Sequence, residues 1–256
     1  MRWLAVLLAL AGCRPDPAMT VPRSAHGVAI GTVTLQWSNV HAVLGEHVLI
    51  VDSGARGDFH ELTTGLRTLG VRLADVKCAV ITHGHADHAG TARAMQLAGI
   101  TIIAGAADLD RTTRGFHGPH HPTGIFSWLL KFFLPEHYTP FTADVQVTAE
   151  MGRYDLRPVC GIDGEVIAMP GHTAGSLVVV VGGGKVALVG DLFRGGQLAG
   201  MIHKHEPMVH FYQDDRRQAH AQIRALLARG VETFVLGHGG PASRADVERV
   251  FGDGEK

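Results

Sequence analysis

Four residues that commonly ligate metal ions lie within one short stretch, Thr82-His83-Gly84-His85-Ala86-Asp87-His88. The apolar run before it, residues 78–81, predicts a buried strand, and residues 87–97 predict a helix that ends before Gly99. The four side chains would then lie on a loop and on the first turn of a helix, where they can face a common point. On one continuous helix they would fan out by about 100° per residue and could not converge. Because imidazole nitrogens and carboxylate oxygens bind borderline divalent cations, the stretch predicts a metal site.

The pattern His-x-His-x-Asp-His after an apolar strand resembles the signature of the metallo-β-lactamase superfamily of metallohydrolases. The rest of that family's pattern can be matched in order, at Asp52, His172, Asp191 and His238, each of which follows an apolar, strand-like run. The resemblance covers residues 27 to the C-terminus. It implies an α+β fold, the αββα sandwich, which the repeated succession of predicted strands and helices fits.

The resemblance also implies a ligand set with two metal subsites. The implied ligands are His83, His85 and His172 at one subsite, Asp87, His88 and His238 at the other, and Asp191 bridging both. Two zinc ions are the expected cofactors, with iron or manganese as alternatives. Asp52 would hydrogen-bond one of the ligand histidines and fix its tautomer.

Such a centre implies a hydrolytic mechanism. Two cations about 3.5–4 Å apart would share a water molecule and deprotonate it near neutral pH, and the bridging hydroxide would be the nucleophile. Asp87 would be the catalytic residue that orients the hydroxide and shuttles its proton. No nucleophile-elbow motif is present in the sequence.

The residue type at position 191 narrows the range of substrate classes that we expect. True metallo-β-lactamases usually carry Cys or Ser there, whereas an aspartate resembles glyoxalase II and the lactonases. We therefore expect a dinuclear hydrolase of a small ester, thioester, lactone or amide. Three alternatives stay open: a mononuclear iron persulfide dioxygenase sharing His83, His85, His172 and Asp191, a β-lactam hydrolase, and a metal-binding lipoprotein without turnover.

The N-terminus predicts export and lipidation. Residues 1–12 are short and apolar, as in a signal peptide, and Leu10-Ala11-Gly12-Cys13 resembles the lipobox of bacterial lipoproteins. In such proteins the signal is removed before the cysteine, which carries the lipid. We therefore expect a signal peptide at 1–12, a tether at 13–24 lipidated on Cys13, and one catalytic domain at 25–256. The expected location is the bacterial cell envelope, facing the periplasm, with the outer membrane favoured over the inner.

Composition argues against nucleic-acid binding, and it leaves open whether two of the three cysteines form a disulfide. The 256 residues are 46% hydrophobic with a formal net charge of −1, so no polyanion-binding surface is indicated and we expect a small-molecule substrate rather than nucleic acid. Besides Cys13, only Cys78 and Cys160 occur. They could pair in an oxidising compartment, but we expect two thiols in the core.

Residues 115–143 interrupt the regular pattern. The segment 125–134 is almost uniformly apolar and aromatic, and we expect a helix packed on the protein's own core, with a pocket wall or a membrane-contacting patch as alternatives. Four histidines lie in the surrounding loop, and we expect them at the surface rather than among the ligands. They are His117, His120, His121 and His137.

Overall fold

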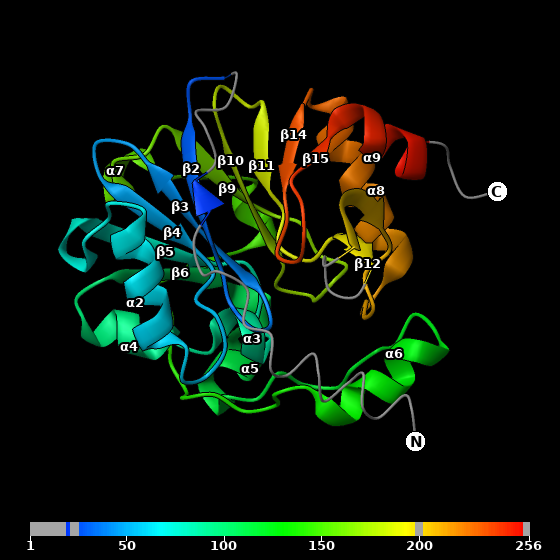
Figure 1. The fold of residues 1–256 in the computed structure, drawn as a ribbon, viewed down its shortest axis with the longest axis horizontal. Coiled ribbons are helices and arrows are strands. Elements are labelled where there is room, and N and C mark those ends of the chain that lie inside the picture. The colour runs from blue at the N-terminus through cyan, green and yellow to red at the C-terminus, as the bar shows by residue number, and fades with distance from the viewer. Residues whose placement is uncertain (1–18, 21–25, 198–201, 253–256) are drawn as a thin grey trace.

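The computed structural model describes residues 19–20, 26–197 and 202–252, and it has four layers (Figure 1). Two sheets lie face to face, and helices cover the outer face of each. The predicted signal peptide, Cys13 and most of the predicted tether fall outside the described residues.

The first sheet has seven strands in chain order. They are β1 (Met19–Thr20), β2 (Ala29–Thr34), β3 (Asn39–Leu44), β4 (Val48–Val51), β5 (Val76–Ile81), β6 (Thr101–Gly105) and β7 (Val145–Val147). Pairing is antiparallel from β1 to β4 and parallel from β4 to β7. The central strands β4 and β5 are buried almost throughout, which explains their continuous apolar runs.

The second sheet has six strands in the order β15-β14-β11-β10-β9-β8. They are β8 (Tyr154–Asp155), β9 (Gly164–Ala168), β10 (Leu177–Val181), β11 (Val186–Leu188), β14 (Thr233–Val235) and β15 (Ala242–Ser243). Strands β11 and β14 are parallel neighbours, and the other pairs are antiparallel. Strands β12 (Arg194–Gln197) and β13 (Ile202–Met208) pair antiparallel in a separate two-stranded sheet.

Short helices complete the sandwich. They are α2 (Phe59–Thr68), α3 (Ala86–Ala89), α4 (Ala92–Leu97), α5 (Leu109–Arg114), α6 (Ile125–Leu130), α7 (Arg157–Cys160), α8 (Arg216–Ala228) and α9 (Arg244–Phe251), with 3₁₀ turns at Leu73–Asp75, Ala106–Asp108, Lys131–Phe133 and Ala149–Met151. Apolar side chains of α2, α3 and α4 pack on the first sheet, and those of α8 and α9 pack on the second. A third apolar cluster fills the space between the sheets.

The predicted helix at 87–97 is two helices with a break at Gly90 and Thr91. The backbone N–H and the hydroxyl of Ser53 both donate to the carbonyl of His88, at 2.8 and 2.7 Å. A side chain at Gly90 would strike the backbone of Ala55. The loop after β4 therefore packs into the break and replaces part of the helical hydrogen bonding, which helix periodicity could not reveal.

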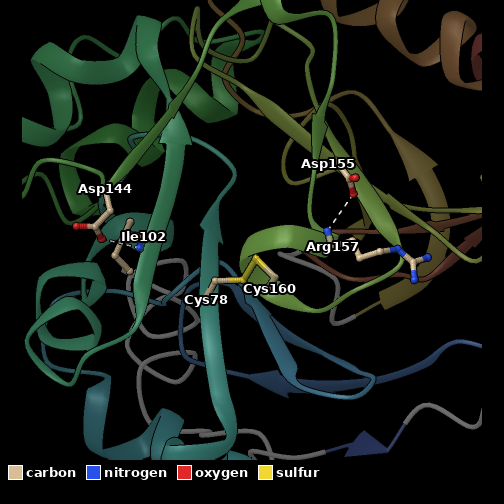
Figure 2. The surroundings of a disulfide bond; sticks show 6 residues. All are labelled: Cys78, Ile102, Asp144, Asp155, Arg157 and Cys160. Carbon is tan, nitrogen blue, oxygen red and sulfur yellow. Dashed lines mark hydrogen bonds between the residues drawn. A yellow bond between two sulfur atoms is a disulfide. The ribbon is translucent and has the colours of Figure 1, made fainter.

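Cys78 and Cys160 form a disulfide, so the expectation of two separate core thiols is wrong (Figure 2). Cys78 lies on β5 of the first sheet, and Cys160 ends α7, which precedes β9 of the second. Both are completely buried, and their Cα atoms are 5.5 Å apart. Residues 82 positions apart in the chain are thus joined across the two halves of the sandwich.

Replacing both cysteines with alanine is expected to lower the free energy of unfolding by about 2–5 kcal/mol, because the crosslink restricts an 82-residue loop in the unfolded chain. Urea denaturation of Cys78→Ala/Cys160→Ala against the oxidised wild type measures this difference. Fully reduced wild-type protein should fall close to the double variant. Equal unfolding free energies for oxidised protein and double variant would contradict the crosslink.

The expectation that the apolar segment 125–134 packs on the protein's own core is wrong. Its helix α6 lies apart from both sheets in Figure 1, and Ile125 is 85% and Phe132 67% exposed. Phe126, Trp128 and Leu129 are exposed as well. None of the helices in the described part of the chain combines the length and the apolar character needed to cross a bilayer.

Candidate metal centre

The predicted ligands follow the carboxyl ends of strands, in loops or, for Asp87 and His88, in the short helix α3. His83 and His85 follow β5, His172 follows β9, Asp191 follows β11 and His238 follows β14. Because β5 and β4 are parallel, as are β11 and β14, these loops emerge at one edge of the sandwich. The alternation of buried strand and polar loop in the sequence therefore places the side chains together.

Three histidines form a first group. The Nε2 atom of His83 is 3.1 Å from Nδ1 of His85, and Nε2 of His172 is 3.1 Å and 3.0 Å from those two atoms. All three side chains are buried. Ligands bound at about 2.0–2.1 Å in a tetrahedral site are a little over 3 Å apart, so the spacing fits one cation.

Asp87, His88 and His238 form a second group. The Nε2 atoms of His88 and His238 are 3.3 Å apart, and each is 3.5 Å from Oδ2 of Asp87. Asp87 and His88 come from the short helix α3, where they are consecutive, and His238 comes from the other half of the chain. This group also fits a single cation.

Asp191 lies between the two groups. Its Oδ2 is 3.1 Å from Nε2 of His238 and 3.3 Å from that of His88, and 3.7 Å and 3.8 Å from those of His172 and His83. Its other oxygen, Oδ1, is buried and has no hydrogen-bond partner among the described residues. A buried carboxylate in contact with both groups, with one oxygen left unpaired, has the placement of a bridging ligand.

Asp52 holds His88 from behind the centre. Its Oδ2 lies 2.8 Å from Nδ1 of His88, and its carboxylate also accepts hydrogen bonds from the backbone and hydroxyl of Thr82. The residue has a φ of +68°, a left-handed conformation that is uncommon outside glycine. With Nδ1–H donated to Asp52, the Nε2 atom of His88 is free to face the centre.

Backbone contacts orient a second ring. His172 Nδ1 donates to the carbonyl of Tyr212 at 2.9 Å, so its Nε2 faces the first group. Both orienting contacts, at Asp52 and at Tyr212, occupy Nδ1 of the ring and leave Nε2 aimed at the same place. That is the tautomer a metal ion requires.

The charges differ between the two groups. Burial lowers the pKa of His83, His85 and His172 well below the ordinary value, and neighbouring histidines lower it further, so these imidazoles are neutral. Neutral imidazole is the form that binds a cation.

The second group is tuned in the opposite direction. For His88 burial again lowers the pKa, but the carboxylates of Asp191, Asp87 and Asp52 outweigh it, and the pKa is raised well above its usual range. Asp191 outweighs burial at His238 in the same way. The pKa of Asp191 is held well below its ordinary value, since His238 and His88 outweigh the effect of its burial. In the chain alone, protons on His88 and His238 would balance the negative charge of the buried carboxylates. A divalent cation bound by the second group would take over this balance.

The sequence prediction missed His210. This buried histidine follows β13, and its Nε2 is 3.2 Å from Oδ2 of Asp191. With His172 and Asp191 it forms a further group of three candidate ligands. No spacing rule points to His210, because it comes from a loop with no other ligand and reaches the centre only through folding.

The sequence prediction also missed Asp108, which connects two ligand loops. Its Oδ2 accepts hydrogen bonds from the backbone of Gly84 at 2.8 Å and the hydroxyl of Thr173 at 2.7 Å, and Oδ1 accepts one from the backbone of Gly175 at 3.1 Å. The side chain is buried. Asp108 therefore fixes the loop of His83 and His85 against the loop of His172.

Asp108→Ala is expected to lower the free energy of unfolding by about 2–4 kcal/mol, because buried donors on both loops lose their acceptor. Metal affinity should fall with it, since the first group of histidines loses its alignment. Urea denaturation and metal titration measure the two effects. Asp110→Ala, at an exposed aspartate two residues away, is the control and should change neither. Equal unfolding free energies for Asp108→Ala and Asp110→Ala would refute the conclusion that Asp108 fixes the two ligand loops together.

The expectation that all four loop histidines lie at the surface is wrong for two of them. His121 and His137 are exposed, but His117 is only 2% exposed and His120 is half-buried. The ring centroids of His117 and His120 are 5.8 Å and 6.2 Å from that of His85. The loop thus places two further imidazoles beside the first group.

Comparisons with known proteins agree with this geometry. The family model described as "Metallo-beta-lactamase superfamily" matches residues 35–238. "Metallo-beta-lactamase domain-containing protein 1" of Xenopus laevis is 27% identical over 216 residues, 83% of this chain and 72% of that protein. "Probable metallo-hydrolase YqjP" of Bacillus subtilis is 26% identical over 161 residues, 55% of this chain and 47% of that relative, so the match spans about half its length.

Solved structures share the architecture. A metallo-β-lactamase with a HARLDQ motif from Cronobacter sakazakii has a TM-score of 0.61 at 20% identity, covering 90% of this chain and 81% of that one. BJP-1, a subclass B3 metallo-β-lactamase of Bradyrhizobium japonicum, has a TM-score of 0.59 at 17% identity, covering 88% and 78%. At these identities the likeness establishes the fold, and it confirms the predicted αββα sandwich. Since the family model covers most of the domain, the chain belongs to the metallo-β-lactamase superfamily and is a metallohydrolase of that fold.

Proposed function

We propose that this protein is a dinuclear hydrolase of a small ester, thioester, lactone or amide, of the glyoxalase II and lactonase branch of its family. The observation that carries the proposal is the position of Asp191, whose Oδ2 contacts nitrogen ligands of both groups. Two bound zinc ions, or iron or manganese, would supply Lewis acidity and a water of lowered pKa at this centre.

The chain's own residues would do the following. His83, His85 and His172 would hold one cation, and the second group would hold the other. Asp87 Oδ2 is the candidate proton acceptor, because its side chain is 23% exposed, against 0% for His88 and 12% for His238, so it can reach both the centre and solvent. Asp52 keeps His88 in the tautomer that the centre needs.

The test is a screen of metal-replete, full-length protein against thioesters, lactones, esters and β-lactams. For the substrate that is turned over, His85→Ala and Asp87→Ala should each lower kcat/KM by about 10³-fold or more. His60→Ala, at an exposed histidine on α2, is the matched control and should leave kcat/KM unchanged. Hydrolysis that persists in both site variants would overturn the proposed mechanism.

The alternatives give different results in the same experiments. A persulfide dioxygenase would contain one iron per chain and consume oxygen. Preferential turnover of β-lactams would favour the activity named in the solved relatives, and the shared fold keeps this second candidate open. A non-catalytic metal-binding lipoprotein would bind metal and turn over nothing.

We further propose that the protein is exported and anchored by lipid at Cys13, facing the periplasm, at the outer rather than the inner membrane. Two features support export and membrane contact. The disulfide suits an oxidising compartment. The exposed apolar segment formed by α6 and the following 3₁₀ turn carries Lys131, whose ammonium lies over the rings of Trp128 and Phe132 at 5.3 and 5.2 Å, a combination common at membrane surfaces. Cys13→Ser should move the protein from the membrane fraction to the soluble fraction, and unchanged fractionation would refute the anchor.

A further inference from the structure

A cluster of potential ligands beside the main centre is not used by the proposed mechanism. It consists of His117, His120 and Glu136, and one ligand atom from each lies within 4.8 Å of the others. None of the three belongs to the family pattern that the sequence matches. The cluster is close to the first group, since both rings lie about 6 Å from that of His85.

The ring nitrogens of the two imidazoles are buried without hydrogen-bond partners in the described part of the chain. All four ring nitrogens of His117 and His120 are shielded from solvent, and none has a hydrogen-bond partner among the described residues. The rings stack on each other at a centroid distance of 3.9 Å. A buried polar group without a hydrogen bond loses its solvation and gains nothing in return, so the arrangement is unfavourable for stability unless something binds there.

The surrounding loop is built to hold these residues together. The backbone N–H of His117 donates to the carbonyl of Glu136 at 3.1 Å, and Tyr138 N–H donates to the carbonyl of Gly115 at 2.9 Å. The guanidinium of Arg111 donates to the carbonyl of His117. These contacts join the two arms of the loop, so His117 and Glu136 are adjacent by backbone structure and not by a chance side-chain rotamer.

The same loop is fixed to the metal-binding loop. The hydroxyl of Tyr138 donates to the carbonyl of Gly84, between His83 and His85, at 3.0 Å. The ring of His120 contacts that of Tyr212 at 4.7 Å, and Tyr212 also supplies the carbonyl that orients His172.

Burial lowers the pKa of His117 and His120 to about 4, so both rings are neutral near pH 7.

We propose that His117, His120 and Glu136 bind a third divalent cation of the zinc class, beside the main centre. Two imidazole nitrogens and one carboxylate oxygen are a donor set that zinc accepts, with a fourth position left for water or for an oxygen of the substrate. Metal bonds of about 2.0–2.1 Å would draw the three ligand atoms closer than they lie here. The cation would take one of the two unpaired nitrogens of each ring and would fasten the loop that carries α6.

Zinc titration of full-length protein tests this site. Glu136→Gln and His120→Gln should each bind one zinc ion fewer than wild type, or bind that ion at least about tenfold more weakly. His137→Gln and His121→Gln change exposed histidines of the same loop and should keep the wild-type stoichiometry. Glu136→Gln removes only a charge at an exposed side chain, so this variant should remain folded. A substitution at buried His117 could unfold the protein and is therefore not used.

A second pair of variants separates this site from the main centre. Asp191→Asn protein should still lose one zinc ion when Glu136→Gln is added, because the two sites share no ligand. The comparison counts metal and needs no substrate, so it holds even if the proposed hydrolysis is wrong. Equal zinc stoichiometry and affinity in wild type, Glu136→Gln and His120→Gln would overturn the third site.

Discussion

Replacing Asp191 with asparagine is expected to lower kcat/KM by about 10³-fold or more and to remove metal from the main centre. The side chain is completely enclosed, and its Oδ2 is within 3.8 Å of Nε2 atoms in both groups. Asparagine has nearly the same shape but no charge, and its amide can place N–H groups against nitrogens that must face a cation. Both groups should therefore lose affinity together.

Metal analysis after dialysis and steady-state kinetics on the substrate found in the screen measure the effect. The control is Asp163→Asn, which removes a charge at an aspartate whose side chain is 86% exposed and pairs with Arg157. It should retain wild-type metal content and kcat/KM. Full metal content and activity in Asp191→Asn would show that the two groups do not form one centre.

Substituting Gly237 with alanine is expected to lower kcat/KM by about 10²-fold or more in a protein that remains folded. An added Cβ at this position would strike Oδ1 of Asp191 and would lie 2.8 Å from Cε1 of His88. The backbone cannot easily move away. Gly237 N–H donates to the carbonyl of Gly190 at 2.9 Å, and its own carbonyl accepts from Asn39 N–H at 2.8 Å. The methyl group must therefore displace the carboxylate between the two groups.

The matched control for this prediction is Gly124→Ala. Nothing lies within 4 Å of a Cβ at Gly124, and its φ of −170° is extended backbone open to any residue. Overpacking at Gly237 should cost about 1–3 kcal/mol of unfolding free energy by urea denaturation, and Gly124→Ala should cost much less. Wild-type kcat/KM and metal content in Gly237→Ala would contradict the placement of Asp191 against this glycine.

The described structure also explains why the sequence prediction of α6 went wrong. Uniform apolar character over 125–134 requires an apolar environment, but periodicity cannot say whether protein, substrate or lipid provides it. The surrounding chain fixes α6 at its start and side: Thr123 Oγ1 donates to the carbonyl of His210, and Tyr212 Oη donates to that of Ser127. The helix is held against the loop after β13, which leaves most of its apolar side chains exposed.

What the sequence alone could determine is local in the chain. The strands before the metal loops were predicted because buried strands are continuous apolar runs. The start of α9 is also set locally, by Ser243, a cap whose hydroxyl accepts from Asp246 N–H. The seven ligands were predicted because their types and their positions after strands resemble the pattern of the metallo-β-lactamase superfamily. The structure brings all seven together, and metal binding by them stays a prediction.

What only the tertiary structure decided depends on residues far apart in the chain. The disulfide joins positions 82 residues apart, and no spacing rule selects that pair. Asp108 and His210 enter the site through loops with no ligand pattern of their own. The burial of His117 likewise depends on a return of the chain at Glu136. In each case the reason is a contact between segments that are distant in the chain, so the local sequence carries no signal for it.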